Sequence, residues 1–263
     1  MSDYLSTHKT RILAIANQKG GVGKTTTAIN LAAALVELGR RVLVVDVDPQ
    51  GNASTGLGIG TKARRLTTYD LLIEGETLAD VAQKTRIEGL LVAPATTDLS
   101  SADIEMVSNE RRSFLLRDAL RGPDAAEMAI DYILIDCPPS LSLLTVNALV
   151  AADAVLIPLQ SEFFALEGLS QLMLTIREVR QSANPALRIE GVVLTMYDSR
   201  NNLAQQVQAD ARETLGEVVF RTIVPRNVRV SEAPSFALPV LSYDPTSKGA
   251  EAYRALAQEI VAR

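Results

Sequence analysis

Length, composition and charge already limit what this chain can be. Its 263 residues, 47% hydrophobic and 22% charged, exclude a disordered polar chain and suffice for one large α/β domain or two small ones. A single cysteine, Cys137, excludes an intramolecular disulfide and a thiolate metal cluster, and fits a cytoplasmic protein. The 26 Lys and Arg against 31 Asp and Glu give a net charge of −5, so nucleic-acid binding requires a local basic patch.

The order of apolar and polar segments predicts the fold. Residues 1–10 are polar and are expected to form a flexible arm, and residues 11–263 are expected to form one domain. Short apolar runs alternate with segments of helical period, which indicates βαβ units. The expected strands are 12–16, 42–45, 90–93, 132–135, 154–159 and 192–196, and the expected helices are 25–38, 141–151, 166–182, 203–215 and 250–261. We therefore predict a doubly wound, mostly parallel α/β sheet with helices on both faces.

Two other stretches carry weaker signals. Residues 51–86 mix glycine, threonine and charges, so we expect loops and short helices there. The longest apolar run, 148–159, is interrupted by Asp153 and falls short of the ~18 residues that a membrane span needs. We predict no membrane-spanning helix.

The strongest motif follows the first expected strand. Residues 19–26 read Lys-Gly-Gly-Val-Gly-Lys-Thr-Thr and open into a helix. In a phosphate loop, glycines turn backbone N–H groups toward phosphates, a lysine reaches the terminal phosphates and a hydroxyl ligates Mg²⁺. In the usual pattern G-x-x-x-x-G-K-[ST], Lys24 and Thr25 match the last two positions. Gln18, however, stands where that pattern has its first glycine. The predicted nucleotide-binding residues of this deviant loop are Lys19, Gly20, Gly21, Val22, Gly23, Lys24, Thr25 and Thr26.

Three carboxylates follow two of the expected strands. Asp46 and Asp48 end the second strand, where the carboxyl ends of parallel strands face the ligand crevice of an open α/β sheet. Asp136 follows the apolar run 132–135. This is the arrangement of a Walker B carboxylate, which follows an apolar strand and holds Mg²⁺ directly or through water. Period-two geometry places Asp46 and Asp48 on one side of the strand, so a capping role for Asp46 remains an alternative.

Several motifs in a fixed order resemble the ParA/Soj family of chromosome-partition ATPases, within the MinD/ParA superfamily. They are residues 17–27, 46–52, 136–140, 162–168 and 225–229, and the likeness runs from about Arg11 to the C-terminus. The resemblance implies a Mg²⁺-dependent ATPase whose ATP-bound homodimer, a face-to-face sandwich, binds double-stranded DNA without sequence preference. It further implies release from the nucleoid when a ParB/Spo0J-type centromere-binding partner stimulates hydrolysis.

The resemblance also implies roles for residues around the nucleotide. Lys19 matches the signature lysine that reaches across the dimer to the partner's phosphates, and Lys24 matches the lysine of the catalytic phosphate loop. Asp48 positions or activates the attacking water, while Asp46 supports Mg²⁺ or the loop around it. Pro225 and Asn227 line the adenine pocket. Residues 162–168 border the dimer interface, and a loop that merely opens the following helix remains the alternative.

Arg200 and Arg229 match the arginines with which the family grips the DNA backbone. Arginine suits this role because its guanidinium is always charged and binds phosphate through two donors. Between Tyr197 and Arg254, however, seven basic residues face seven acidic ones. A dimer would have to bring two weak patches together, and solvated surface arginines remain the alternative.

Three other functions fit less well. A MinD-like membrane ATPase should carry a basic amphipathic tail, whereas residues 250–263 have mixed charge and small side chains. A nitrogenase-reductase-like electron carrier needs more cysteines than Cys137. About ten residues precede the first strand, so the operator-binding domain of some plasmid relatives is not expected, which disfavours sequence-specific repression.

Overall fold

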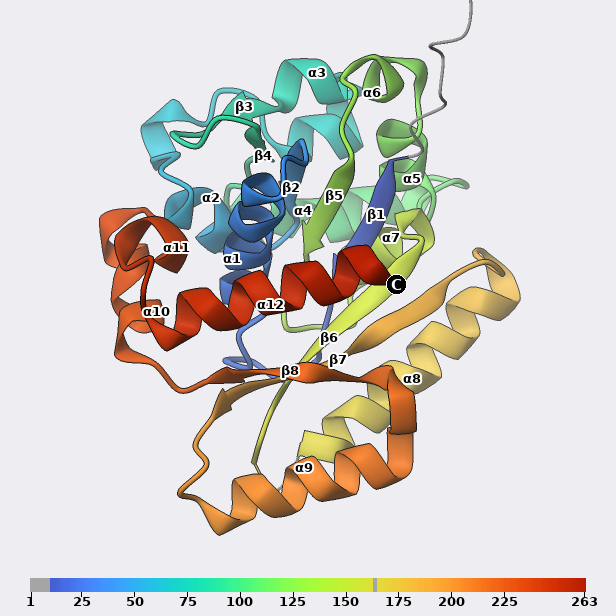
Figure 1. Ribbon diagram of the computed structural model, residues 1–263. Helices are drawn as coiled ribbons and strands as arrows, with labels where there is room; N and C mark the ends of the chain where they lie inside the picture. Colours follow the sequence, from blue (N-terminus) through green and yellow to red (C-terminus); the bar gives the residue numbers. More distant parts are fainter. Residues whose placement is uncertain (1–9, 163–164) are drawn as a thin grey trace, which may run out of the picture.

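We describe residues 10–162 and 165–263 of the protein from a computed structural model. One eight-stranded sheet runs through this part of the chain (Figure 1). All neighbouring strands are parallel except β3 and β4, which confirms the predicted doubly wound, mostly parallel α/β fold. In spatial order the strands are β3 (Gln83–Lys84), β4 (Leu90–Ala93), β2 (Val42–Asp46), β5 (Tyr132–Asp136), β1 (Arg11–Ile15), β6 (Ala154–Gln160), β7 (Arg188–Tyr197) and β8 (Val219–Pro225).

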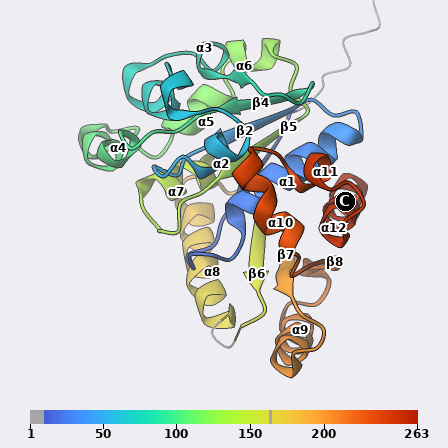
Figure 2. The same cartoon turned by 90° about the vertical axis from the view of Figure 1, so that its left-hand side faces the viewer.

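Helices cover both faces of this sheet (Figures 1 and 2). The longer ones are α1 (Lys24–Glu37), α7 (Leu143–Ala151), α8 (Ala165–Ser182), α9 (Asn202–Leu215) and α12 (Lys248–Ala262). The shorter ones are α2 (Asn52–Gly56), η1 (Thr61–Ala63), η2 (Asp70–Glu74), α3 (Leu78–Val81), α4 (Leu99–Glu105), η3 (Met106–Ser108), α5 (Leu115–Leu120), α6 (Pro123–Glu127), η4 (Gly216–Val218), α10 (Val228–Glu232), η5 (Ala233–Phe236) and α11 (Val240–Tyr243).

The central strand β1 shows why the strand sequences are almost continuously apolar. Ile12 and Ala14 belong to the hydrophobic core that α7 and α8 cover, whereas Leu13 and Ile15 belong to the core beneath α1 and α12. A strand buried on both faces needs apolar side chains at every position. Each core thus receives alternate residues of the same strand.

The long helices fall within two residues of their predicted bounds at either end, and residues 51–86 form loops and short helices as expected. The prediction missed two edge strands, β3 and β8. In β8, Arg221 is exposed and Thr222 half-buried, because β8 is an edge strand with a single neighbouring strand, β7. The continuous apolar run that marks a central strand is therefore lacking there.

The sheet brings the motifs to one edge. Asp46 at the end of β2 is the register partner of Asp136 at the end of β5, and Asp136 pairs in turn with Ile15 at the end of β1. The order changes direction at β1, since the chain crosses from β1 to one side for β2 and later to the other for β6. Ligands of open α/β sheets bind at such a switch point.

In the described residues no helix is both long and apolar enough to cross a bilayer.

Candidate nucleotide-binding site

The loop between β1 and α1 adopts the conformation of a phosphate loop. Gly21 and Gly23 have φ values of 76° and 88°, in the left-handed region that favours glycine. Two side-chain bonds hold the loop against neighbouring strands. The Asn17 amide donates to the Pro158 carbonyl of β6 (2.8 Å), and the Thr195 hydroxyl of β7 donates to the Val22 carbonyl (2.8 Å). The loop is thus fixed in shape by the sheet on which it lies.

Lys24 is the first residue of α1 and is buried. Its ammonium donates to the Lys19 carbonyl at 3.0 Å, so the side chain lies back over the loop. Burial lowers the pKa of Lys24, and the nearby carboxylate of Asp136 opposes that shift. A buried ammonium directed along a helix N-terminus is suited to a phosphate group.

Asp46 is buried and fully engaged within the chain. One carboxylate oxygen accepts bonds from the Ser54 N–H (2.8 Å) and the Ser54 hydroxyl (2.6 Å), and the other accepts the Asp48 N–H (3.2 Å). Burial raises the pKa of Asp46 to about 6, against the effect of the Ser54 bonds. These bonds occupy both Asp46 oxygens, so of the two expected roles the geometry favours support of the loop over support of Mg²⁺.

Asp136 is the contrasting case. It is fully buried, and within the described chain neither carboxylate oxygen accepts a well-formed hydrogen bond. Burial, followed by the charge of Asp46, raises its pKa well above the usual value, although the Thr25 hydroxyl and Lys24 favour the charged form. A buried carboxylate without partners is costly unless a cation completes it. Asp136 and Thr25 therefore fit Mg²⁺.

The remaining ligands of such an ion would not come from further carboxylates. Among the described residues no group of three or more His, Cys, Asp or Glu side chains could hold a metal. Mg²⁺ ordinarily takes one or two protein ligands together with substrate phosphates and water, so this donor set suits it. Asp48 lies close enough to act on the charge of Lys24, and its carboxylate accepts the Gln50 N–H at 3.0 Å.

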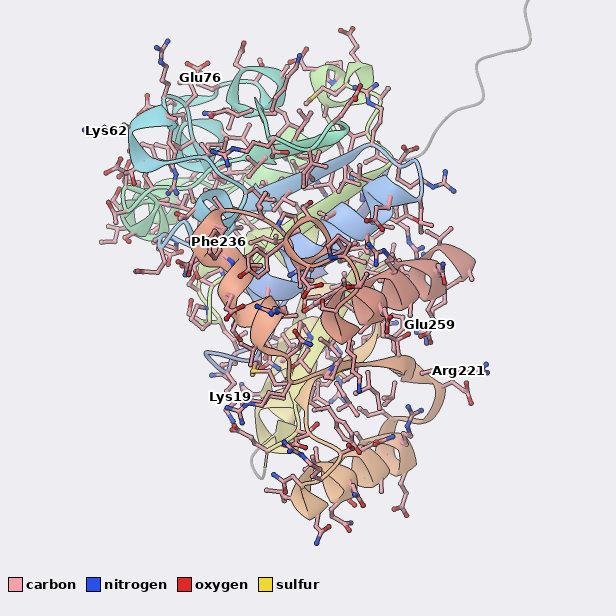
Figure 3. All side chains as sticks on the ribbon, turned by 60° about the vertical axis from the view of Figure 1, so that its left-hand side comes forward. Lys19, Lys62, Glu76, Arg221, Phe236 and Glu259 are labelled. Carbon is pink, nitrogen blue, oxygen red and sulfur yellow. The ribbon has the colours of Figure 1, made fainter. Side chains whose placement is uncertain are left out.

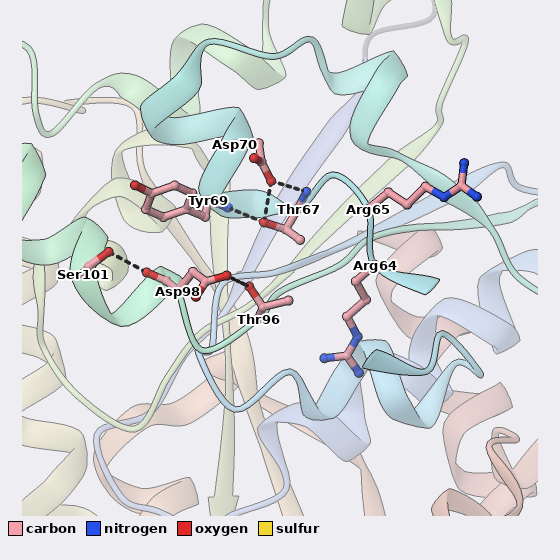
Figure 4. A pocket seen from close by; sticks show the side chains of 8 residues that line it. All are labelled: Arg64, Arg65, Thr67, Tyr69, Asp70, Thr96, Asp98 and Ser101. Carbon is pink, nitrogen blue, oxygen red and sulfur yellow. Dashed lines mark hydrogen bonds between the residues drawn. The ribbon is translucent and has the colours of Figure 1, made fainter. Parts of the chain in front are cut away.

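The loop that carries these carboxylates is braced by an arginine that sequence analysis missed. Arg64 donates to the carbonyls of Ala95 (2.7 Å) and Ile59 (3.0 Å) and to the Thr55 hydroxyl (2.7 Å). Gly51 has a φ of 63°, and a Cβ there would come within 2.2 Å of the Arg64 guanidinium. Arg64 also lines a polar cavity of about 330 Å³ (Figure 4). The glycine of the 46–52 motif is thus required by close approach as well as by its backbone conformation.

A cavity of about 260 Å³ adjoins the phosphate loop where the adenine pocket was expected. Pro225 and Asn227 line it together with Gly23, Met196 and Tyr253. The Asn227 side-chain oxygen accepts the N–H groups of Arg229 (2.9 Å) and Val230 (3.3 Å) and so caps α10. The amide group therefore has its NH₂ to offer to a base, while its oxygen is occupied.

Met196 and Tyr253 are lining residues that the sequence did not indicate. Met196, the last residue but one of β7, has a φ of 49°, a left-handed conformation that is rare for a side chain of this size. Tyr253 comes from α12 and is buried, which raises its pKa to about 12. Strain at Met196 next to the phosphate loop is typical of a functional site.

The expected cross-dimer residue is held within its own chain. The Lys19 ammonium lies 2.6 Å from a Glu162 carboxylate oxygen, and the two side chains are 35% and 49% exposed. Of the predicted interface segment 162–168, residues 163–164 lie outside the described residues, whereas Glu162 lies beside the phosphate loop.

The two candidate DNA-contact arginines are exposed and paired with acids. Arg200, 88% exposed, binds both carboxylate oxygens of Asp198 at 2.9 and 2.8 Å. Arg229 on α10 lies 2.9 Å from Glu232 and 3.2 Å from Asp244. The Arg226 N–H donates to the Tyr197 carbonyl at 2.9 Å, so the segments that carry the arginines leave adjacent strands side by side.

Comparisons with known proteins agree with this geometry. A family model described as an AAA domain matches residues 10–189. The chain is 59% identical to the chromosome partitioning protein ParA of Caulobacter vibrioides, over 98% of this chain and 97% of that protein. It is 51% identical to the sporulation initiation inhibitor protein Soj of Bacillus subtilis, over 96% and 98% of the two chains.

A solved structure is similar over the same length. Cobyrinic acid a,c-diamide synthase from Mycobacterium smegmatis, with bound ADP and magnesium, superposes with a TM-score of 0.81 at 38% identity. The match covers 95% of this chain and 93% of that one.

Proposed function

The chain belongs to the ParA/Soj family of chromosome-partitioning ATPases, and on that premise we propose that it is an ATP-controlled DNA-binding switch. Two copies pair face to face when ATP and Mg²⁺ are bound. The paired form binds double-stranded DNA without sequence preference, in the cytoplasm and on the nucleoid. A ParB/Spo0J-type centromere-binding partner stimulates ATP hydrolysis and so releases the protein from DNA.

Within one copy, each residue of the nucleotide site has a distinct task. The N–H groups of the loop from Gly20 to Thr26 and the Lys24 ammonium hold the phosphates. Thr25 and Asp136 hold Mg²⁺, which neutralises charge on the phosphates when bound. Asp48 orients the attacking water and accepts its proton. Asp46 keeps the Asp48 loop in place through Ser54.

The base binds in the cavity formed by Pro225, Asn227 and the strained Met196. Pro225 supplies an apolar contact, and the Asn227 NH₂ donates to an acceptor nitrogen of adenine. A pocket that borders the phosphate loop at Gly23 allows one nucleotide to fill both parts.

The observation that carries the proposal is the division of labour between the two lysines of the loop. Lys24 is buried over its own loop. Lys19 is half-exposed and directed to Glu162, at the carboxyl ends of the strands β1 and β6. A cation at that position can reach a phosphate in a second copy and stabilise charge that develops during transfer, as an arginine finger does. This supports a site that is completed by pairing.

A membrane-directed function receives no support from the C-terminal helix. In α12 the side chains of Tyr253, Leu256 and Ile260 are buried against the protein rather than presented to a bilayer. An amphipathic membrane helix needs its apolar face free.

Sedimentation velocity tests the proposal directly. With ATP and Mg²⁺ the chain should sediment as a dimer, and with ADP or without nucleotide it should sediment as a monomer. An unchanged sedimentation coefficient in all three conditions would contradict the proposed switch.

A further inference from the structure

Three acidic side chains form ion pairs with Arg200 and Arg229. Asp198, Glu232 and Asp244, here called the acidic clasp, each lie within 3.2 Å of one of the two arginines. With the exposed Arg226, the clasp and the arginines comprise three cations and three anions. These six side chains therefore carry no net charge, although the proposed function requires the arginines among them to bind a polyanion.

We propose that the acidic clasp sets DNA affinity by competing with phosphate for Arg200 and Arg229. The proposal rests on the DNA-binding function proposed above and identifies Asp198, Glu232 and Asp244 as the residues that weaken it. DNA phosphate must displace or approach a carboxylate at each arginine. One copy then binds weakly, and two copies on one DNA are needed for useful affinity.

The geometry at Asp198 supports direct competition. Arg200 uses Nε and one terminal nitrogen for the two oxygens of Asp198, which is the same pair of donors that would bind a phosphate. The Asp198 carboxylate also accepts the backbone N–H of Arg200 at 3.0 Å. It is therefore held in front of the guanidinium by the loop itself.

Stability does not account for the ion pair between Arg200 and Asp198. Arg200 is almost fully exposed, and ion pairs in water contribute little to folding because solvent screens them. Asp198 is two residues from Arg200 in a surface loop that follows β7, so it joins no distant elements. Its removal should leave the fold intact, which makes the proposal testable by substitution.

Arg229 provides an independent case on another element. Glu232 lies one helical turn along α10, and Asp244 follows α11. Both carboxylates contact the same guanidinium, so neutralising one leaves the other in place. The matching variant is thus the double substitution Glu232→Gln/Asp244→Asn.

The experiment measures binding of a random-sequence DNA duplex by fluorescence anisotropy, with ATP and with ADP, at several salt concentrations. Asp198→Asn should bind about fivefold more tightly per copy at low salt, because one negative charge beside a phosphate is removed. Its affinity should also fall more steeply with salt. Glu232→Gln/Asp244→Asn should act in the same direction through Arg229.

Glu76→Gln is the matched control, because it removes the same charge from an exposed acid just before α3, at the opposite end of the molecule from α9 (Figures 1 and 3). Affinities of both clasp variants equal to that of Glu76→Gln, with wild-type DNA binding intact, would overturn the acidic clasp alone. Absence of DNA binding by the wild type and by every variant would overturn the proposed function as well. DNA binding gained by the clasp variants from a non-binding wild type would support the clasp.

Discussion

The Lys19 ammonium lies 2.6 Å from a carboxylate oxygen of Glu162, 143 residues away in the same chain. The contact arises because β1 and β6 are neighbours, so that the phosphate loop after β1 and the segment after β6 leave the sheet side by side. In the proposed dimer Lys19 exchanges this carboxylate for a phosphate of the second copy. Both side chains are partly exposed, so breaking the ion pair costs little.

Lys19→Ala and Asp48→Ala should separate in sedimentation. Lys19→Ala keeps ATP but loses the cross-dimer cation, so it should remain monomeric. Asp48→Ala keeps ATP but hydrolyses it slowly, so it should accumulate as a dimer. If both variants remain monomeric with ATP, the assignment of Asp48 to chemistry and of Lys19 to the dimer contact is wrong.

Lys24→Ala should weaken ATP binding by roughly a hundredfold, because the phosphates lose a charge-assisted partner at a buried position. Isothermal calorimetry measures this directly. The fold should persist, since the hydrogen bond that the Lys24 ammonium donates within the described part of the chain goes to a loop carbonyl. ATP affinity equal to that of the wild type would remove Lys24 from the site.

Asp136→Asn should stabilise the nucleotide-free chain at pH 7 by roughly 1–2 kcal/mol, because it removes an unpartnered buried charge. It should also abolish the further rise in melting temperature that Mg²⁺ produces when ATP is present. Since the folded-state pKa of Asp136 is raised, the wild type takes up a proton more readily when folded. Its deficit relative to the variant should therefore shrink as pH falls below 7.

A variant that is less stable than the wild type and still responds to Mg²⁺ would contradict the metal role of Asp136. Glu76→Gln again serves as the control, because Glu76 is exposed and should change neither property.

The Asp198 carboxyl should titrate at an unusually low pH. The hydrogen bonds from Arg200 lower its pKa to about 2. A depressed acid contributes stability above its unfolded value, and that contribution is lost as pH falls through the folded value, so the ion pair stays intact at neutral pH. NMR of the side-chain carbonyl should show the midpoint rising toward about 3.9 in Arg200→Ala. An unchanged midpoint would show that the two groups do not interact in solution.

The fold was largely predictable because its strands are buried on both faces. Such strands leave continuous apolar runs, and the amphipathic helices between them have a clear period. The edge strand β8 was not predicted, since Arg221 interrupts its apolar pattern. Local pattern thus sufficed wherever burial was complete.

The site was predictable as a set of motifs, but the partners of each residue were not. Ser54, which lies in a stretch with no regular pattern, donates a hydrogen bond to the Asp46 carboxylate. Glu162 forms an ion pair with Lys19, which lies after a different strand. Met196 of β7 and Tyr253 of α12 line the cavity next to Gly23 that is proposed to bind the base. These contacts depend on tertiary packing between distant segments, which neither periodicity nor spacing records.

The central claim is that nucleotide controls DNA binding, and binding to random-sequence duplex DNA with ATP, ADP or no nucleotide tests it most directly. We predict that binding appears with ATP alone, does not depend on sequence and weakens with salt. Arg200→Glu and Arg229→Glu should reduce this affinity and its salt dependence while leaving ATP-dependent dimerisation intact. Equal binding by the ADP form, or a strong preference for one sequence, would contradict the account.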